Sequence, residues 1–322
     1  MCASPAPRDR PALPWWLAWL IGTACLAAFL FSFDLRPALR QIAHVNFFWV
    51  LLALLGNFAV LPLLTAQWRR FLPPGNPVPW GVMWECVTLS MAAMNTVPFG
   101  GGLAVAIGLI ARRAKTGWSG ALSLMALEQL CDGIAKLALL LAALAVIPLP
   151  GHWRRGAWLL AAAVLGGLLV LLWLAQHPDQ EAAPEGWRHE WSRRLLIMKQ
   201  PGPFAIAVGL SLAMKAAGLV SIYAVQRSLG IDLPVAATTL VLAATTFATL
   251  IPIAPGNLGI YQAAAFGAYR LLGVPEIDAV ALGLVLHLTF IIPAVGTGYL
   301  MTAWKALFHA RSPAQSLTSA SK

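Results

Sequence analysis

The chain has 322 residues, of which 59% are hydrophobic and 11% charged, and its formal net charge is +10. A soluble domain carries roughly a quarter charged residues, so this composition excludes a soluble globular protein and predicts a polytopic membrane protein. The Lys and Arg residues are scattered over short loops rather than gathered on one soluble face, which argues against nucleic-acid binding. The positive excess is instead typical of the cytoplasmic loops of a membrane protein.

Apolar runs long enough to span a bilayer occur at six places along the chain. They cover residues 15–33, 47–65, 118–147, 157–175, 203–225 and 279–302. Between them lie two pairs of shorter apolar runs, and each pair is divided by a stretch rich in Pro and Gly. The two pairs are 80–97 with 103–111 and 234–250 with 258–272.

The Pro- and Gly-rich stretches interrupt regions where a spanning helix should continue. Proline lacks an N–H group and glycine is a poor helix former, so both stretches are predicted helix breaks. The breaking residues are Pro98, Gly100, Gly101 and Gly102 in the first stretch, and Pro252, Pro255, Gly256 and Gly259 in the second. Breaks in matching positions of two halves indicate a transporter's binding site, although breaks that serve packing alone would give the same pattern.

Each broken pair is either two short spans or a re-entrant hairpin, and the charge count favours the hairpin. With an uncleaved first helix, a cytoplasmic N-terminus and two re-entrant pairs, fourteen Lys and Arg residues lie inside and six outside. The outer six are Arg36, Arg40, Arg154, Arg155, Arg227 and Arg270. Ten full crossings would move most of the positive charge outside, against the usual bias. We therefore predict an all-α protein of six spans and two re-entrant pairs in the bacterial inner membrane, with both termini cytoplasmic.

The whole chain, residues 1–322, is predicted to form one integral membrane domain. Its halves, about 15–147 and 157–302, each contain two spans, a broken pair and a third span. An odd number of crossings per half inverts the second half, which predicts an inverted repeat whose two breaks meet near the midplane. Residues 176–202 are expected to form a cytoplasmic loop, either an interfacial amphipathic helix or a plain connection. The tail 312–322 is expected to be disordered.

Four charged side chains inside predicted spans are candidates for substrate binding. Glu128, Asp132 and Lys136 recur every fourth residue and so share one face of the helix over 118–147. Lys215 lies at comparable depth in the second half. Charges at this depth normally face the bundle interior, where they either form a salt bridge that joins helices or line a substrate cavity.

Further candidates for substrate binding lie near the breaks. They are Asn95, Asn257, Gln262 and His287. Amide side chains can also cap free backbone groups, and Asn257 has a structural alternative because asparagine tolerates the left-handed conformation. His287 and Glu85, each taken alone, are more often satisfied core groups. Helices that begin near Leu103 and Leu258 would aim free N–H groups into the membrane interior, which favours an anionic headgroup.

Signals for enzyme chemistry are absent from the sequence. It contains no Walker loop, no GxSxG motif, no metal-ligand spacing and no nucleophile–base spacing, so we expect no enzyme activity, no cofactor and no metal. Three of the four cysteines, Cys25, Cys86 and Cys131, fall in apolar segments, and no CxxC pair occurs. These cysteines are expected to be small buried hydrophobes.

Three segments of the chain carry a resemblance to a known family. Residues 254–262 read Ala-Pro-Gly-Asn-Leu-Gly-Ile-Tyr-Gln, residues 128–132 read Glu-Gln-Leu-Cys-Asp, and Asn-Thr-Val-Pro-Phe-Gly-Gly-Gly at 95–102 is followed by Thr-Gly-Trp-Ser at 116–119. They resemble, in turn, the Pro-Gly-Gly-x-Gly-x-x-Glu signature, the Glu-Arg-x-x-Asp segment and the first half of the lysylphosphatidylglycerol synthase transmembrane-region family. The resemblance covers roughly residues 15–305 and implies a flippase-like membrane domain.

The resemblance places Pro255, Gly256, Gly259, Glu128 and Asp132 at positions of the family motifs. The chain also departs from the family pattern, because charged residues of the family are replaced by neutral ones or by histidine. Gln262 stands where the family has glutamate, Gln129 where it has arginine, and His287 where an arginine is usual.

We expect the protein to translocate an anionic or polyprenyl-type lipid across the inner membrane. The expected partners are a lipid with an anionic headgroup, no nucleic acid, and either an envelope enzyme or a second copy of the chain. Two alternatives stay open. One is a non-transporting accessory protein of cell-envelope lipid metabolism, and the other is an intramembrane transferase that uses Glu128 or Asp132 as a base.

Overall fold

The computed structural model describes residues 20, 23–24, 26–27, 31, 35–72, 78–97, 101–147, 151–176, 201–250 and 254–309. Every regular element within these residues is helical, so the predicted all-α fold is confirmed. The predicted span 15–33 lies mostly outside the described residues. The predicted loop 176–202 lies almost entirely outside them, and the tail 312–322 entirely so.

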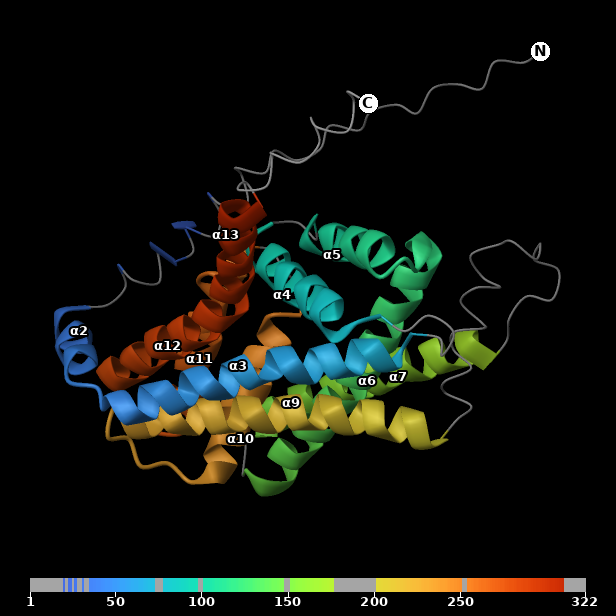
Figure 1. Cartoon of the computed structure of the whole chain (residues 1–322). Helices are drawn as coiled ribbons and strands as arrows, with labels where there is room; N and C mark the ends of the chain where they lie inside the picture. Colours follow the sequence, from blue (N-terminus) through green and yellow to red (C-terminus); the bar gives the residue numbers. More distant parts are fainter. Residues whose placement is uncertain are drawn as a thin grey trace, which may run out of the picture.

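The helices follow the predicted apolar runs closely (Figure 1). The first part of the chain forms α2 (Leu35–Ala43), α3 (Phe47–Arg70), α4 (Trp80–Thr96), α5 (Gly101–Arg113), α6 (Gly117–Val146) and α7 (Gly151–Gln176). The second part forms α9 (Pro201–Ser228), α10 (Val235–Ala248), the 3-10 turn η2 (Pro255–Asn257), α11 (Ile260–Leu271), α12 (Glu276–Ile291), the π-helical turn η3 (Ile292–Gly296) and α13 (Thr297–His309). The short helix α2 was not predicted from the sequence.

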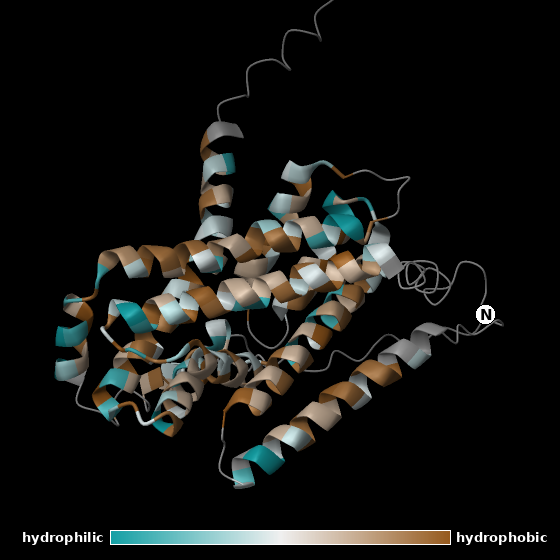
Figure 2. Cartoon of the chain, turned by 90° about the horizontal axis from the view of Figure 1, so that it is seen from below, coloured by the Kyte–Doolittle hydropathy of each residue, from teal (hydrophilic) through white to brown (hydrophobic). Residues whose placement is uncertain are grey.

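The surface of the bundle is suited to lipid. Among the described residues, four segments are long and apolar enough to cross a membrane: α3, α6, residues 202–228 of α9, and residues 276–307 across α12 and α13. Large apolar side chains such as Phe47, Leu159 and Leu300 are more than 70% exposed. Hydrophobic residues run along the helices and hydrophilic ones gather near helix ends (Figure 2). Such an exposed apolar surface is expected where hydrocarbon is the solvent, so the chain is a membrane protein.

Helices α3 and α9 pack side by side in opposite directions and form the most extensive helix pair of the described bundle (Figure 1). At one end the Asn46 N–H donates to the Ser228 carbonyl oxygen at 2.9 Å. Toward the other end Gln67 Nε2 donates to Ser211 Oγ at 2.7 Å. A Cβ at Gly56 would collide with α9. This small residue therefore permits the close helix approach that is common inside membranes.

Each broken pair folds back on itself as an antiparallel hairpin. In the first hairpin, α4 and α5, Glu85 near the start of α4 pairs with Arg113 at the end of α5, at 3.2 Å. In the second hairpin, α10 and α11, Thr238 and Tyr269 both bond the same α9 side chain, Gln226, at 3.0 and 3.2 Å. Because α3 and α9 are antiparallel and each precedes its own hairpin, the two hairpins open toward opposite ends of the bundle. That each hairpin leaves the membrane by the face it entered stays a prediction.

The last predicted span, 279–302, is divided by the π-helical turn η3. Pro293 lies in this turn and has no N–H group to donate, so the regular hydrogen-bond ladder is interrupted and α13 turns away from α12 (Figure 1). A Cβ at Gly298 would lie only 2.6 Å from the Thr88 carbonyl oxygen. The glycine therefore lets α13 pack directly on α4.

Candidate functional site

The second break interrupts the chain between α10 and α11 through three residues with positive φ. Gly256, Asn257 and Gly259 have φ values of 59°, 53° and 82°. An α-helix cannot pass through this left-handed backbone, which glycine and asparagine tolerate best. The predicted break is confirmed, and Asn257 has the left-handed conformation that its structural alternative requires. Pro255 begins the 3-10 turn η2, and Pro252 lies outside the described residues.

Gln262 and His287 hold the second break in place through hydrogen bonds to its backbone. Gln262 Oε1 accepts from the Gly259 N–H at 2.8 Å, and Gln262 Nε2 lies 2.7 Å from His287 Nδ1. His287 Nε2 lies 2.7 Å from the Gly256 carbonyl oxygen, and the Tyr261 ring stacks on the imidazole. One tautomer satisfies all these contacts: the amide donates to Nδ1, and Nε2–H donates to the carbonyl. Both side chains are buried and line neither cavity described below, and their hydrogen bonds position the second break. That they bind substrate stays a prediction.

The first break turns the chain from α4 into α5 with little space between the two helices. Asn95 Nδ2 donates to the Met91 carbonyl oxygen at 2.8 Å, which fixes the amide near the end of α4. A Cβ at Gly102 would overlap the backbone of α4, and a Cβ at Gly101 would lie 2.7 Å from Val97 Cγ1. These two glycines therefore allow α5 to fold back. Pro98 and Gly100 lie outside the described residues.

The two breaks meet inside the bundle, as predicted. A Cβ at Gly256 would lie 3.4 Å from the Asn95 carbonyl oxygen, so the backbones of the two breaks are neighbours. A cavity of about 230 Å³ lies at this junction and is lined by residues of both breaks, among them Asn95, Gly102 and Asn257. Segments about 160 residues apart in the sequence thus share one wall.

A larger cavity of about 350 Å³ adjoins this junction between α3, α6, α9 and α10. Its lining includes Glu128, Asp132, Lys136, Lys215 and Asn257. The two cavities have six lining residues in common, and we refer to them together as the central cavity. The shared residues are Met91, Met94, Gln129, Lys136, Thr249 and Asn257. Six of the eight predicted substrate-binding residues therefore lie in the wall of one cavity.

Asp132 is the centre of the charge cluster in this cavity. Asp132 Oδ2 lies 2.6 Å from Nζ of Lys136, one turn along α6. Asp132 Oδ1 lies 2.6 Å from Nζ of Lys215 on α9. Glu128, one turn earlier, accepts from Gln129 Nε2 at 2.6 Å. Both interpretations of these residues are thus realised: they form a salt bridge that joins helices, and they also line a cavity. Asp132 is bonded directly to both lysines, and Glu128 adds a second carboxylate to the same wall.

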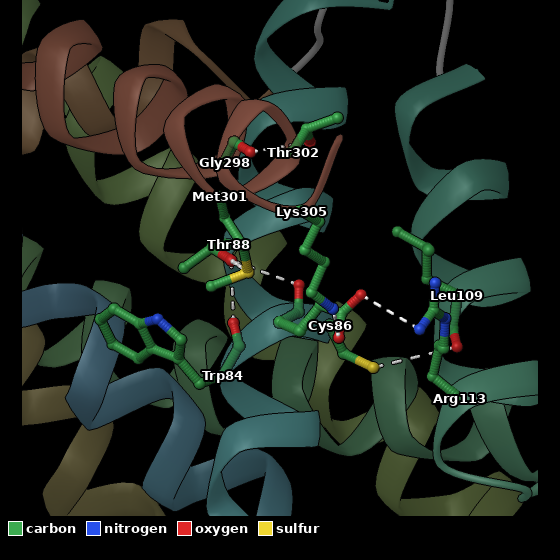
Figure 3. A network of polar contacts seen from close by, with 10 residues as sticks. Trp84, Cys86, Thr88, Leu109, Arg113, Gly298, Met301, Thr302 and Lys305 are labelled. Atoms are coloured by element: carbon green, nitrogen blue, oxygen red, sulfur yellow. Dashed lines mark hydrogen bonds and ion pairs between the residues drawn. The ribbon is translucent and has the colours of Figure 1, made fainter. Parts of the chain in front are cut away.

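Glu85 belongs to a second charge cluster away from the central cavity. Its carboxylate pairs with Arg113 of α5 at 3.2 Å and with Lys305 of α13. Figure 3 shows Arg113 and Lys305 converging on α4, with the neighbouring Cys86 Sγ directed to the Leu109 carbonyl oxygen. Glu85 is therefore a satisfied polar group that ties α4 to two other helices, as expected for a core residue.

Sequence reasoning missed the hydroxyl groups of α10 that line the central cavity. Thr245, Thr246 and Thr249 all lie in its wall. Thr245 Oγ1 donates to the Val241 carbonyl oxygen at 2.9 Å, and Thr249 Oγ1 donates to the Thr245 carbonyl oxygen at 2.8 Å. The signal was present, because these three threonines recur at helical spacing and so share one helical face.

Among the residues that the structure describes, no group of three His, Cys, Asp or Glu side chains could hold a metal ion. No curated protein matches the sequence.

The family described as lysylphosphatidylglycerol synthase TM region has a model that matches residues 15–298. This match covers both breaks and the whole central cavity. The chain therefore belongs to the lysylphosphatidylglycerol synthase transmembrane-region family, as its motifs predicted, and is a membrane protein of lipid metabolism or transport.

Proposed function

We propose that this protein is a flippase-like translocator that moves a lipid with an anionic headgroup across the bacterial inner membrane. The observation that carries the proposal is the central cavity, a space within a membrane bundle where charged and hydroxyl side chains line part of the wall and where two helix breaks meet. Broken helices in transporters place backbone groups and charges around a substrate in this way. The lipid is moved without chemical change, so the protein is not an enzyme.

The packing of the helices supports an inverted repeat that alternates access to this cavity. The first hairpin packs against α13 through α4, and the second hairpin packs against α6 through α10. Each hairpin thus contacts the last long helix of the other half. The hairpins also open toward opposite ends of the antiparallel α3–α9 pair. Rocking of one half against the other would expose the central cavity to each side in turn.

The chemistry of the wall favours a phosphate-containing headgroup. Lys136 and Lys215 supply two cations beside the carboxylates of Glu128 and Asp132, and residues at the start of α5, including Gly102, line the same cavity. A helix N-terminus attracts anions through its free N–H groups and its dipole. The Asn257 side-chain oxygen is buried and has no hydrogen-bond partner among the described residues. Hydroxyls or an amine of a headgroup would satisfy it.

The direct test is leaflet exchange of fluorescent phosphatidylglycerol and polyprenyl-phosphate analogues in proteoliposomes, followed by chemical quenching. The Asp132→Asn variant removes the charge that both lysines share, so we expect exchange to fall by about tenfold or more. Asp232→Asn is the matched control, because Asp232 is exposed and pairs with Arg227 outside the central cavity. Thermal unfolding in detergent must give similar midpoints for the two variants.

Other outcomes would contradict the proposal in distinct ways. Exchange no faster than in empty liposomes, for both lipid types, would favour a non-transporting accessory protein of envelope lipid metabolism. Exchange that Asp132→Asn leaves unchanged would place the lipid path outside the central cavity. A lipid of altered mass after incubation with the protein would instead indicate an intramembrane transferase.

A further inference from the structure

A second cavity, distinct from the central one, lies between α6, α7, α10 and α11. Its volume is about 550 Å³, and fifteen of its sixteen lining residues are apolar, His152 being the exception. Nine of the sixteen are alanine or glycine. We refer to this space as the apolar cavity. Its volume falls within the range of small-molecule binding sites, ~300–1,000 Å³.

The cavity exists because small residues face one another across the helices. A Cβ built on Gly267 of α11 would have no atom within 4 Å, although this residue is only partly exposed. Walls that face empty space lose their dispersion contacts, and an apolar cavity does not gain from holding water. The occupant that restores those contacts is therefore apolar, and the available apolar material at this depth is lipid hydrocarbon.

Helix α10 separates the apolar cavity from the central cavity and contributes a different face to each. Leu240, Ala243, Ala244 and Phe247 line the apolar cavity. Leu242, Thr245, Thr246 and Thr249 line the central cavity. The two sets repeat at helical spacing on opposite sides of one helix. A site with charged and hydroxyl side chains and a site with almost entirely apolar side chains, on either side of one helix, match the two parts of a lipid molecule.

We propose that the apolar cavity is a binding site for one hydrocarbon chain of a membrane lipid. The chain lies between the small residues of α10 and α11, and α6 and α7 cover it from the other side. That the same lipid places its headgroup in the central cavity rests on the proposed function. Binding of the chain does not depend on it, because shape and packing alone fill the apolar cavity.

Photo-crosslinking in proteoliposomes tests the site. The probe is phosphatidylglycerol with a diazirine in the middle of one acyl chain, in vesicles of phosphatidylethanolamine and phosphatidylglycerol, and the labelled peptides are mapped by mass spectrometry. We expect labelling to concentrate on α10 and α11. Gly267→Leu places a side chain in the open space and should lower this labelling roughly tenfold, equivalent to ~1.4 kcal/mol of lost binding. Ala264→Leu, one turn earlier in the lining, should act in the same direction.

Gly167→Leu on α7 is the matched control. A Cβ at Gly167 also meets no atom within 4 Å, but this residue is exposed and does not line the apolar cavity. Labelling spread evenly over all lipid-facing helices, or labelling that both cavity variants leave unchanged, would overturn the site.

Two further probes separate the chain site from the proposed function. A diazirine-bearing diacylglycerol has the acyl chain without the phosphate, so its labelling of the same peptides would support the chain site even if lipid exchange failed. A diazirine-bearing polyprenyl phosphate tests the isoprenoid alternative, and labelling by this probe alone would identify the chain as isoprenoid. Labelling of these peptides by none of the probes would overturn the chain site while leaving the exchange assay as the test of translocation.

Discussion

The two hairpins of the bundle are fastened at their open ends by different chemistry. The first hairpin is held by ion pairs, in which the Glu85 carboxylate meets Arg113 of its own second helix and Lys305 of α13. The second hairpin is held by neutral hydrogen bonds, in which Gln226 of α9 bonds Thr238 of α10 and Tyr269 of α11. The first hairpin is thus tied to the opposite half of the chain, and the second to its own half.

This difference determines which of the two attachments can be weakened by dissolved salt. The side chains of Arg113 and Lys305 are 54% and 40% exposed, so salt screens their attraction to Glu85. Gln226 and Tyr269 are fully buried, and salt does not reach the bonds between them. The contact between the two halves at the first hairpin therefore responds to ionic strength, whereas the second hairpin stays attached to α9.

Glycine substitution at the first break has the largest expected effect on stability. Gly102 of the first break has no room for a side chain, because a Cβ would overlap the backbone of α4. We expect Gly102→Ala to lower the free energy of unfolding by about 3 kcal/mol, since the backbone must move to relieve the overlap. Chemical unfolding in detergent micelles measures this change.

Gly108→Ala in the same helix is the control for that prediction. A Cβ at Gly108 would lie 3.6 Å from a Trp118 ring carbon, an ordinary contact. Alanine in a helix is favoured over glycine by roughly 0.5–1 kcal/mol, so this variant should be slightly stabilised. Equal losses in both variants would show that α5 tolerates no added methyl group, and the close approach at Gly102 would then explain nothing.

The second hairpin should show a smaller loss that salt does not change. Tyr269→Phe removes the hydroxyl that accepts from Gln226 Nε2 and leaves a buried amide N–H group without this partner. We expect a loss of about 2 kcal/mol in the free energy of unfolding, equal at low and high salt. Tyr299→Phe on α13, where the ring is 54% exposed, should change the stability little. A loss that shrinks with salt would mean that charges, and not this hydrogen bond, fasten the second hairpin.

Much of this architecture was predictable because membrane spans and helix breaks have strong local signals. Long apolar runs gave the helices, and Pro-Gly stretches gave the two breaks. The spacing of Glu128, Asp132 and Lys136 placed them on one face, which the structure confirms by the bond between Asp132 and Lys136. The partner of Asp132 on α9 could only be proposed from depth, because helix rotation is set by packing that no local pattern records.

The role of Gln262 and His287 was not predictable from the sequence alone. Each looked like a separate candidate for substrate binding, 25 residues apart in the chain. The structure places them in direct contact, where they hold the second break through neutral hydrogen bonds. The resemblance implies a glutamate and an arginine at these two positions. The two residues that stand in place of these charges are thus direct neighbours in this chain.

The smallest expected effect is also the one that tests the charged attachment of the first hairpin. Glu85→Gln removes the negative charge that Arg113 and Lys305 share but keeps the size and hydrogen-bonding capacity of the side chain. Because both cations are partly hydrated, we expect a loss of only about 1 kcal/mol at low salt. High salt should reduce the stability difference between the variant and the unmodified protein toward zero, because salt screens the same charge attraction that the mutation removes. Glu276→Gln, at an exposed position in the first turn of α12, controls for a general change in surface charge. A Glu85→Gln loss that stays constant as salt rises would show that packing holds the first hairpin to α13, and the contrast between the two hairpins would fail.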